Sequence, residues 1–389
     1  MIRRAIPPTD GPIDGNRVLS RPHTSAHGDS ARADLPPEIP CYGPSPGAVR
    51  TAAAALMAAL PPDLRIGCVT DPSVSAAGPD SPGAGFPTVP GRVILSAPSW
   101  DSRSWRAAMA DCDIVFTLGR PKPGVPGILV MPETIPPQGN IQNTESALPL
   151  TADSALLACI APQPSPDSLP GGVPVFGPED LKPLADIILA RARASAAPLY
   201  GLVLTGGRSL RMRVDKASLI YHGKPQAGHC LDLLSAHCAS TFLSCREDQS
   251  GLPGFSGFNR IHDTFLDMGP MGGILSALRA HRHAAFLVIA CDLPFLDSRT
   301  LAALVAGRDP IRAASAFSGP QNGLPEPLCA IYEPRSYPRM LQLLGQGVGC
   351  PRKFLLNSSS AILPAPDLRA LVNANDPEAY EEVRKSLGA

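Results

Sequence analysis

The chain has 389 residues, enough for two or three domains with cores of their own. Lysine plus arginine and aspartate plus glutamate both number 34, and this zero net charge argues against a binder of nucleic acid or of anionic membranes. No stretch approaches the roughly 20 apolar residues of a membrane span, and the first residues lack the apolar core of a secretory signal. We therefore expect a cytoplasmic globular protein with no nucleic-acid or membrane partner.

Proline is distributed unevenly and divides the chain into two parts. Of the 46 prolines, 32 lie in residues 1–200 and 14 in residues 201–389. Residues 1–40 are rich in Pro, Gly, Ser, Asp and Arg without a sustained period, which predicts a disordered arm. We expect one domain over residues 41–195, a second over residues 199–389, and an Ala/Ser-rich linker between them.

The first domain alternates short apolar runs with loops and helical patterns, which predicts an α/β sheet. Helices are expected over residues 48–60 and 177–192, and the second of these has Pro178 in its first turn. No clear strand is expected before the first helix. The expected strands are the apolar runs at 64–69, 93–96, 113–118, 128–131 and 156–160.

The second domain opens with an apolar strand at residues 200–204 that leads directly into the segment TGGRSLRMRVDKASL. Gly206 and Gly207 lack a β-carbon, so their backbone N–H groups can turn toward an anion. Four cations follow within ten residues, and this pairing of a glycine turn with positive charge indicates a triphosphate site. A plain glycine turn with solvated cations is the alternative. The four cations are Arg208, Arg211, Arg213 and Lys216.

Two aspartates are expected at the ends of later strands. Asp263 closes a short strand before the Gly-rich turn DMGPMGG, and Asp292 follows the apolar strand at residues 285–290. In an open α/β sheet, ligands bind outside the carboxyl ends of the strands, where a carboxylate can hold Mg²⁺. Asp292 is therefore the best metal-ligand candidate, with a turn or helix-capping role as the alternative. Asn373 and Asn375 precede a helix start, and capping does not explain them.

The motifs TGGRSLRMRVDKA, HD with GPMGG, CDLPFL, EPLCAIYEP and NANDPE stand in the order found in molybdenum cofactor guanylyltransferases, and residues 199–389 resemble that family. The resemblance implies a Rossmann-like α/β fold of the nucleotide-diphospho-sugar-transferase type. It also implies a Mg²⁺-dependent nucleotidyltransferase that joins GMP from GTP to molybdopterin and releases pyrophosphate.

The resemblance further implies a role for individual residues. The nucleotide would be held by Leu204, Thr205, Gly206, Gly207, Lys216, Asp263 and Asp292. The catalytic groups would be Arg211, Lys216 and Asp292, of which Asp292 would bind Mg²⁺. Asn373 and Asn375 would face the reacting phosphates.

Two details leave alternatives open. The chain has LTGG where related cytidylyltransferases have LAAG, which favours GTP, while a CTP-dependent enzyme is the alternative. Arg213 stands where the family has glycine, so a non-catalytic carrier of nucleotide or molybdopterin is a further alternative. The basic segment CPRKFLL at residues 350–356 could contact the second substrate or simply be solvated.

The first domain resembles, more weakly, the molybdopterin-guanine dinucleotide biosynthesis adaptor protein. Its loop would need the pattern GxxxxGK[ST], but Val49 and Arg50 stand where the lysine belongs. We expect a degenerate P-loop-like domain that docks cofactor-biosynthesis proteins or acceptor molybdoenzymes. An unrelated α/β domain is the alternative.

Overall fold

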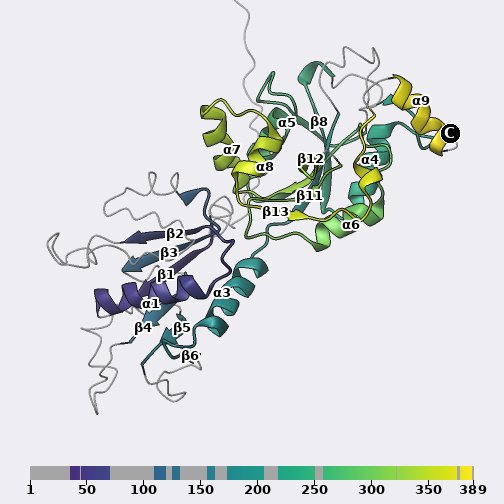
Figure 1. The fold of residues 1–389 in the computed structure, drawn as a ribbon. Helices are drawn as coiled ribbons and strands as arrows, with labels where there is room; N and C mark the ends of the chain where they lie inside the picture. Colours follow the sequence, from purple (N-terminus) through teal and green to yellow (C-terminus); the bar gives the residue numbers. More distant parts are fainter. Residues whose placement is uncertain are drawn as a thin grey trace, which may run out of the picture.

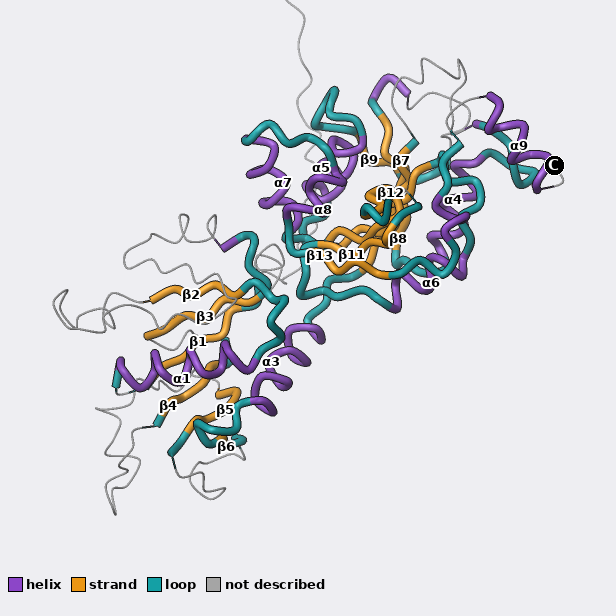
Figure 2. Tube along the Cα trace, in the orientation of Figure 1, coloured by secondary structure: helices purple, strands orange, loops and turns teal. Residues whose placement is uncertain are grey.

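The computed structural model describes residues 36–43, 45–70, 109–119, 125–131, 156–162, 173–205, 218–249, 257–320, 322–374 and 377–387. These residues form two α/β units, each built on its own sheet (Figures 1 and 2). We call them the N-terminal unit, which ends with α3, and the C-terminal unit, which begins with β7. The prediction of α/β architecture is confirmed.

The N-terminal unit has a six-stranded parallel sheet in the order β2-β3-β1-β4-β5-β6. From β1 the chain crosses to the edge strand β2 and returns to β3 beside β1. It then continues on the other side of β1 through β4, β5 and β6. The elements are β1 (Glu38–Tyr42), α1 (Pro46–Ala59), β2 (Ile66–Thr70), β3 (Ile114–Gly119), β4 (Gly127–Val130), β5 (Leu156–Ile160), β6 (Val175–Phe176) and α3 (Lys182–Ala194).

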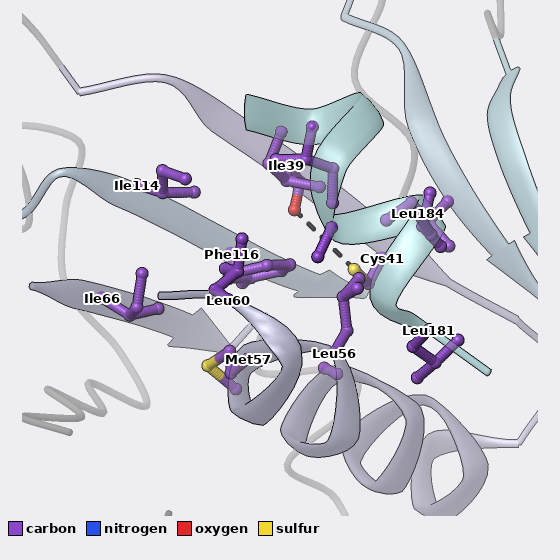
Figure 3. Packing of buried hydrophobic residues seen from close by; sticks show 14 of the residues in the cluster. Ile39, Cys41, Leu56, Met57, Leu60, Ile66, Ile114, Phe116, Leu181 and Leu184 are labelled. Atoms are coloured by element: carbon purple, nitrogen blue, oxygen red, sulfur yellow. Dashed lines mark hydrogen bonds between the residues drawn. The ribbon is translucent and has the colours of Figure 1, made fainter. Parts of the chain in front are cut away.

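Helix α1 begins where its sequence provides a capping residue. The Ser45 hydroxyl accepts a hydrogen bond from the Ala48 N–H at 3.3 Å, and Pro46 fills the first turn, where no N–H partner is needed. Both α1 and α3 bury their apolar faces on the same side of the sheet (Figure 3). Ten of these buried residues are labelled in the figure: Ile39, Cys41, Leu56, Met57, Leu60, Ile66, Ile114, Phe116, Leu181 and Leu184.

Strand β1 differs from the sequence-based expectation. No strand was expected ahead of the first helix, yet β1 begins at Glu38 and pairs with β3 and β4. Only five residues long and interrupted by Pro40, it gives a weak strand signal. The strand expected at residues 93–96 lies outside the described residues.

The C-terminal unit has a seven-stranded sheet in the order β13-β11-β12-β10-β7-β8-β9, in which β12 alone runs antiparallel to its neighbours. Its strands are β7 (Leu199–Leu204), β8 (Ser240–Cys245), β9 (Arg260–His262), β10 (Ala285–Ala290), β11 (Ala314–Ser318), β12 (Pro325–Tyr332) and β13 (Ser360–Leu363). Its helices are α4 (Gln226–Ser235), α5 (Pro270–Ala280), α6 (Ser298–Ala306), α7 (Ser336–Gly345), α8 (Pro351–Asn357) and α9 (Pro377–Leu387).

Helices cover both faces of this sheet (Figure 1). Helices α4 and α6 pack on one face, and α5, α7 and α8 pack on the other, so β7 and β10 lie between two apolar layers. All six residues of β10 are buried, which explains its uninterrupted apolar sequence. Among the described helices, none is long and apolar enough to cross a membrane.

We predict that Leu56→Ala lowers the free energy of unfolding by about 3 kcal/mol, because Leu56 is fully buried between α1 and the sheet and its loss leaves a cavity. Urea denaturation measures the change. Thr51→Ala, on the exposed side of the same helix, is the control and should change stability by less than about 0.5 kcal/mol. Equal effects of the two substitutions would contradict this packing.

Candidate nucleotide site

The candidate site lies at the carboxyl edge of the C-terminal sheet. Leu204 pairs with Ala290 of β10 on one side and with Ser244 of β8 on the other, so these three parallel strands end together. The segments that follow β7, β8, β9 and β10 therefore emerge at one edge, as expected for ligand-binding loops in such sheets. The register brings Thr205, Asp263 and Asp292 to this edge.

A cavity of about 290 Å³ opens at this edge, beside β7, β8 and the start of α5. Three residues assigned from the sequence line it: Leu204, Thr205 and Asp263. The other lining residues are Ser244, Cys245, Arg246, Phe265, Leu266, Asp267, Met268, Gly269, Pro270 and Gly273. Apolar walls with a few polar groups are typical of small-molecule sites.

Asp263 is fixed in the cavity by neighbouring strands. Its Oδ1 accepts a hydrogen bond from the Ser244 hydroxyl at 2.7 Å, and its backbone N–H donates to the Cys245 carbonyl at 3.0 Å. Burial raises the pKa of the Asp263 carboxyl, while the Ser244 hydrogen bond lowers it by a smaller amount. Thr205 also links β7 to β8 at the cavity, because its hydroxyl donates to the Ser244 carbonyl at 2.7 Å.

The segment after Asp263 is tied down by Ser276 of α5. The Ser276 hydroxyl accepts from the Thr264 N–H at 2.8 Å and donates to the Gly272 carbonyl at 2.7 Å. Gly272 lies so close to the Phe265 carbonyl that a β-carbon at this position would collide with it. These contacts hold one wall of the cavity against α5.

The backbone next to Asn373 contacts Asp292, since the Ala374 N–H donates to the Asp292 carbonyl at 2.9 Å. The structure thus brings the backbone beside Asn373, assigned to face the reacting phosphates, to Asp292, assigned to bind Mg²⁺. Five other assigned residues fall outside the described residues: Gly206, Gly207, Arg211, Lys216 and Asn375.

Glu326 is a candidate that the sequence analysis quoted within a motif but gave no role. Strands β10 and β12 pair with Ile289 opposite Cys329, and continuing this antiparallel register places Glu326 opposite Asp292. The Glu326 side chain is buried, accepts from the Leu328 N–H at 3.0 Å, and lies 3.5 Å from the Arg352 guanidinium. Burial, with a smaller contribution from Asp292, raises the pKa of its carboxyl.

Two histidines, also missed from the sequence, support the segment after Asp292. The rings of His222 and His229 stack with centroids 3.8 Å apart, and His222 Nε2–H donates to the Pro294 carbonyl at 3.0 Å. Burial and the neighbouring His222 lower the pKa of His229 to about 4, so that ring is neutral at physiological pH.

The oxygen donors near Asp292 suit a hard cation. Mg²⁺ is commonly held by one or two carboxylates together with substrate phosphates and water, so a complete protein cage is not required. Asp292 and Glu326 supply carboxylates of this kind. Within the described ranges, no group of three or more His, Cys, Asp and Glu side chains is placed to hold a metal ion.

We predict that Ser276→Ala lowers the free energy of unfolding by about 1–2 kcal/mol, because it removes the acceptor for the Thr264 N–H. It should also accelerate hydrogen exchange at the Thr264 amide. The control is Ser235→Ala, on the exposed end of α4, which should leave that exchange rate unchanged. Unaltered exchange at Thr264 in the Ser276 variant would show that Ser276 does not fix the cavity wall.

Known proteins similar to this chain match about half of its length. Residues 201–361 match the family model described as MobA-like NTP transferase domain. A molybdenum cofactor biosynthesis bifunctional protein from Synechocystis sp. is 36% identical over 50% of this chain, which spans 56% of that protein's length. A crystal structure of molybdopterin-guanine dinucleotide biosynthesis protein A from Archaeoglobus fulgidus has 23% identity and a TM-score of 0.41, covering 49% of this chain and 98% of that chain.

A probable molybdenum cofactor guanylyltransferase from Nostoc sp. is 31% identical, and the match covers 46% of this chain and 87% of that protein. A match at this identity over most of a relative's length establishes common descent, and its extent fits the C-terminal unit. The chain therefore belongs to the molybdenum cofactor guanylyltransferase family.

Proposed function

We propose that the C-terminal unit transfers GMP from GTP to molybdopterin and releases pyrophosphate, as a step of molybdenum cofactor biosynthesis. The observation that supports this most directly is the cavity at the carboxyl edge of the sheet, with Asp263 inside it and Asp292 at the end of β10, the strand next to β7. The names of the relatives, a guanylyltransferase and a cofactor-biosynthesis protein, agree with it.

The cavity is proposed to hold the guanine base. A carboxylate accepts hydrogen bonds, and guanine presents adjacent N–H donors at N1 and N2, whereas cytosine offers one amino group. Asp263 is oriented by Ser244 and could accept from both guanine donors, which supports GTP over the CTP alternative. The LTGG sequence at residues 204–207 also favours guanine over cytosine.

The triphosphate is proposed to run from the cavity toward Asp292. Asp292 would hold Mg²⁺ with Glu326 nearby, and the bound ion would neutralise charge on the transferring phosphate. Gly206 and Gly207 are proposed to present N–H groups, and Arg211 and Lys216 positive charge, to the phosphates. Asn373 and Asn375 would orient the second substrate beside them.

The proposed reaction needs no protein nucleophile. A terminal phosphate oxygen of molybdopterin attacks the α-phosphorus of GTP in line, forming the new P–O bond as the bond to the β-phosphate oxygen breaks. Pyrophosphate leaves with the electron pair of that bond. The attacking oxygen is already anionic at neutral pH, so the residues position the two phosphates and balance their charge.

The N-terminal unit is proposed to be a degenerate P-loop-like domain without GTPase activity. The connection between β1 and α1 contains Gly43 but no lysine for the β- and γ-phosphates. It shares with P-loop proteins the succession of strand, glycine-containing loop and helix. The proposed role is structural or protein-binding.

The experiment for the proposed function follows pyrophosphate release with GTP, Mg²⁺ and molybdopterin, and identifies the product by mass spectrometry. A molybdopterin guanine dinucleotide is the expected product. A cytosine dinucleotide formed from CTP alone would favour the cytidylyltransferase, and nucleotide binding without any pyrophosphate release would favour the carrier.

We predict that Asp292→Asn slows this reaction at least about a hundredfold, because the amide keeps the shape of the side chain but loses the charge that Mg²⁺ requires. The control is Asp232→Asn, which changes an exposed aspartate of α4 that pairs with Lys224. This variant should retain the native rate. Both variants should keep the native melting curve. A fully active Asp292→Asn enzyme would exclude Asp292 as the metal ligand.

A further inference from the structure

The two units meet through a charged contact that the proposed reaction does not use. The N-terminal unit contributes an acidic edge, which consists of Asp63, Asp111 and Asp113 at the amino ends of β2 and β3. The C-terminal unit contributes an arginine face, which consists of Arg312, Arg335 and Arg339. The signs of the two surfaces are complementary.

Asp113 lies at the centre of this contact and is 0% exposed. Its Oδ1 accepts a hydrogen bond from Arg335 Nη2 at 2.8 Å. Its Oδ2 accepts from Arg312 Nη1 at 3.2 Å and from the backbone N–H of Arg65 at 2.8 Å. Two guanidinium groups from the C-terminal unit thus converge on one buried carboxylate of the N-terminal unit.

Arg335 is buried in the same contact, with 3% of its surface exposed. Its Nη1 donates to the carbonyls of Cys112 at 3.0 Å and Asp113 at 3.2 Å, and its Nε donates to the Arg312 carbonyl at 2.9 Å. All three guanidinium nitrogens therefore have acceptors, and two of them reach across to the N-terminal unit. A buried charge with this many hydrogen bonds is favourable only while both units are in place.

Further contacts surround this pair. Arg339 lies 3.3 Å from Asp111, Arg312 also pairs with Asp63, and Arg193 of α3 lies 3.2 Å from Asp309. Ile311 of the C-terminal unit is fully buried and packs in the apolar core of the N-terminal unit. The contact thus combines a buried ion-pair cluster with an apolar anchor, which is the anatomy of a stable protein interface.

We propose that the arginine face is a dedicated docking surface for the acidic edge, and that it holds the two units together without help from the covalent linker. Removing either Arg335 or Asp113 from the docked chain would leave the other charge buried and unpaired, which carries a large cost, so the contact accepts only a partner of matching charge. The partner that fits the arginine face is therefore an acidic α/β unit, here supplied by the same chain.

The docking also fixes where the ligand edges of the two sheets lie. Asp63, Asp111 and Asp113 precede parallel strands, as Arg312 precedes β11, so the sheets face each other through their amino ends. In Figure 1 the arrows of β2 and β3 point away from the C-terminal unit. The two carboxyl edges thus face away from each other, and one ligand cannot be shared between them within a chain.

The test uses the full chain with a protease site inserted between the exposed residues Ser195 and Ala196. After cleavage, a dilution series on size-exclusion chromatography measures how tightly the halves remain associated. We expect them to elute together at micromolar concentration. Asp113→Asn should weaken the association about tenfold or more, because the isosteric amide removes the central charge. Asp186→Asn, which removes an exposed ion pair on α3, is the matched control.

Native halves that separate on cleavage at micromolar concentration would overturn the proposal. Equal association of the native chain and Asp113→Asn would also overturn it, since the apolar contact of Ile311 would then suffice. If Asp113→Asn does not fold, Arg339→Gln combined with Arg312→Gln makes the same test at partly exposed positions. Unchanged association in that double variant would likewise contradict a role for the arginine face.

Discussion

The shared register of β7, β8 and β10 is the constraint on which the candidate site depends. Leu204 pairs with Ser244 and Ala290, so three chain segments leave the sheet at the same height and in the same direction. Residues from distant parts of the sequence, such as Thr205 and Asp292, meet at this edge because they directly follow these strands. The buried apolar layers on both faces hold the strands in that register.

The edge separates two chemical environments. On the side of β8 and β9, the cavity has apolar wall residues such as Phe265 and Met268, and Asp263 is oriented by the Ser244 hydroxyl, which suits a base with hydrogen-bond donors. On the side of β10 and β12, Asp292 lies near the buried Glu326 and its partner Arg352, which suits phosphates and a divalent cation. A nucleotide bound along this edge would place its base on the side of β8 and β9 and its phosphates on the side of β10 and β12.

Sequence reasoning succeeded where the signal was local and failed where it was not. The strand at 285–290 is an apolar run that ends before the turn at Asp292, and it was predicted at its observed bounds. The proximity of Glu326 to Asp292 depends on the antiparallel direction of β12, which no local pattern records. The Arg335–Asp113 pair joins residues 222 positions apart, and no local pattern in the sequence marks them as partners.

The proposed binding mode places a guanine nucleotide along the carboxyl edge of the C-terminal sheet, with its base beside Asp263 and its phosphates toward Asp292. The most direct measurement is a crystal structure of the full chain with GTP and Mn²⁺, in which anomalous scattering locates the metal. We expect one Mn²⁺ bound to Asp292 and base density in the 290 Å³ cavity. Nucleotide density on the N-terminal unit with the cavity empty, or Mn²⁺ away from Asp292, would contradict it.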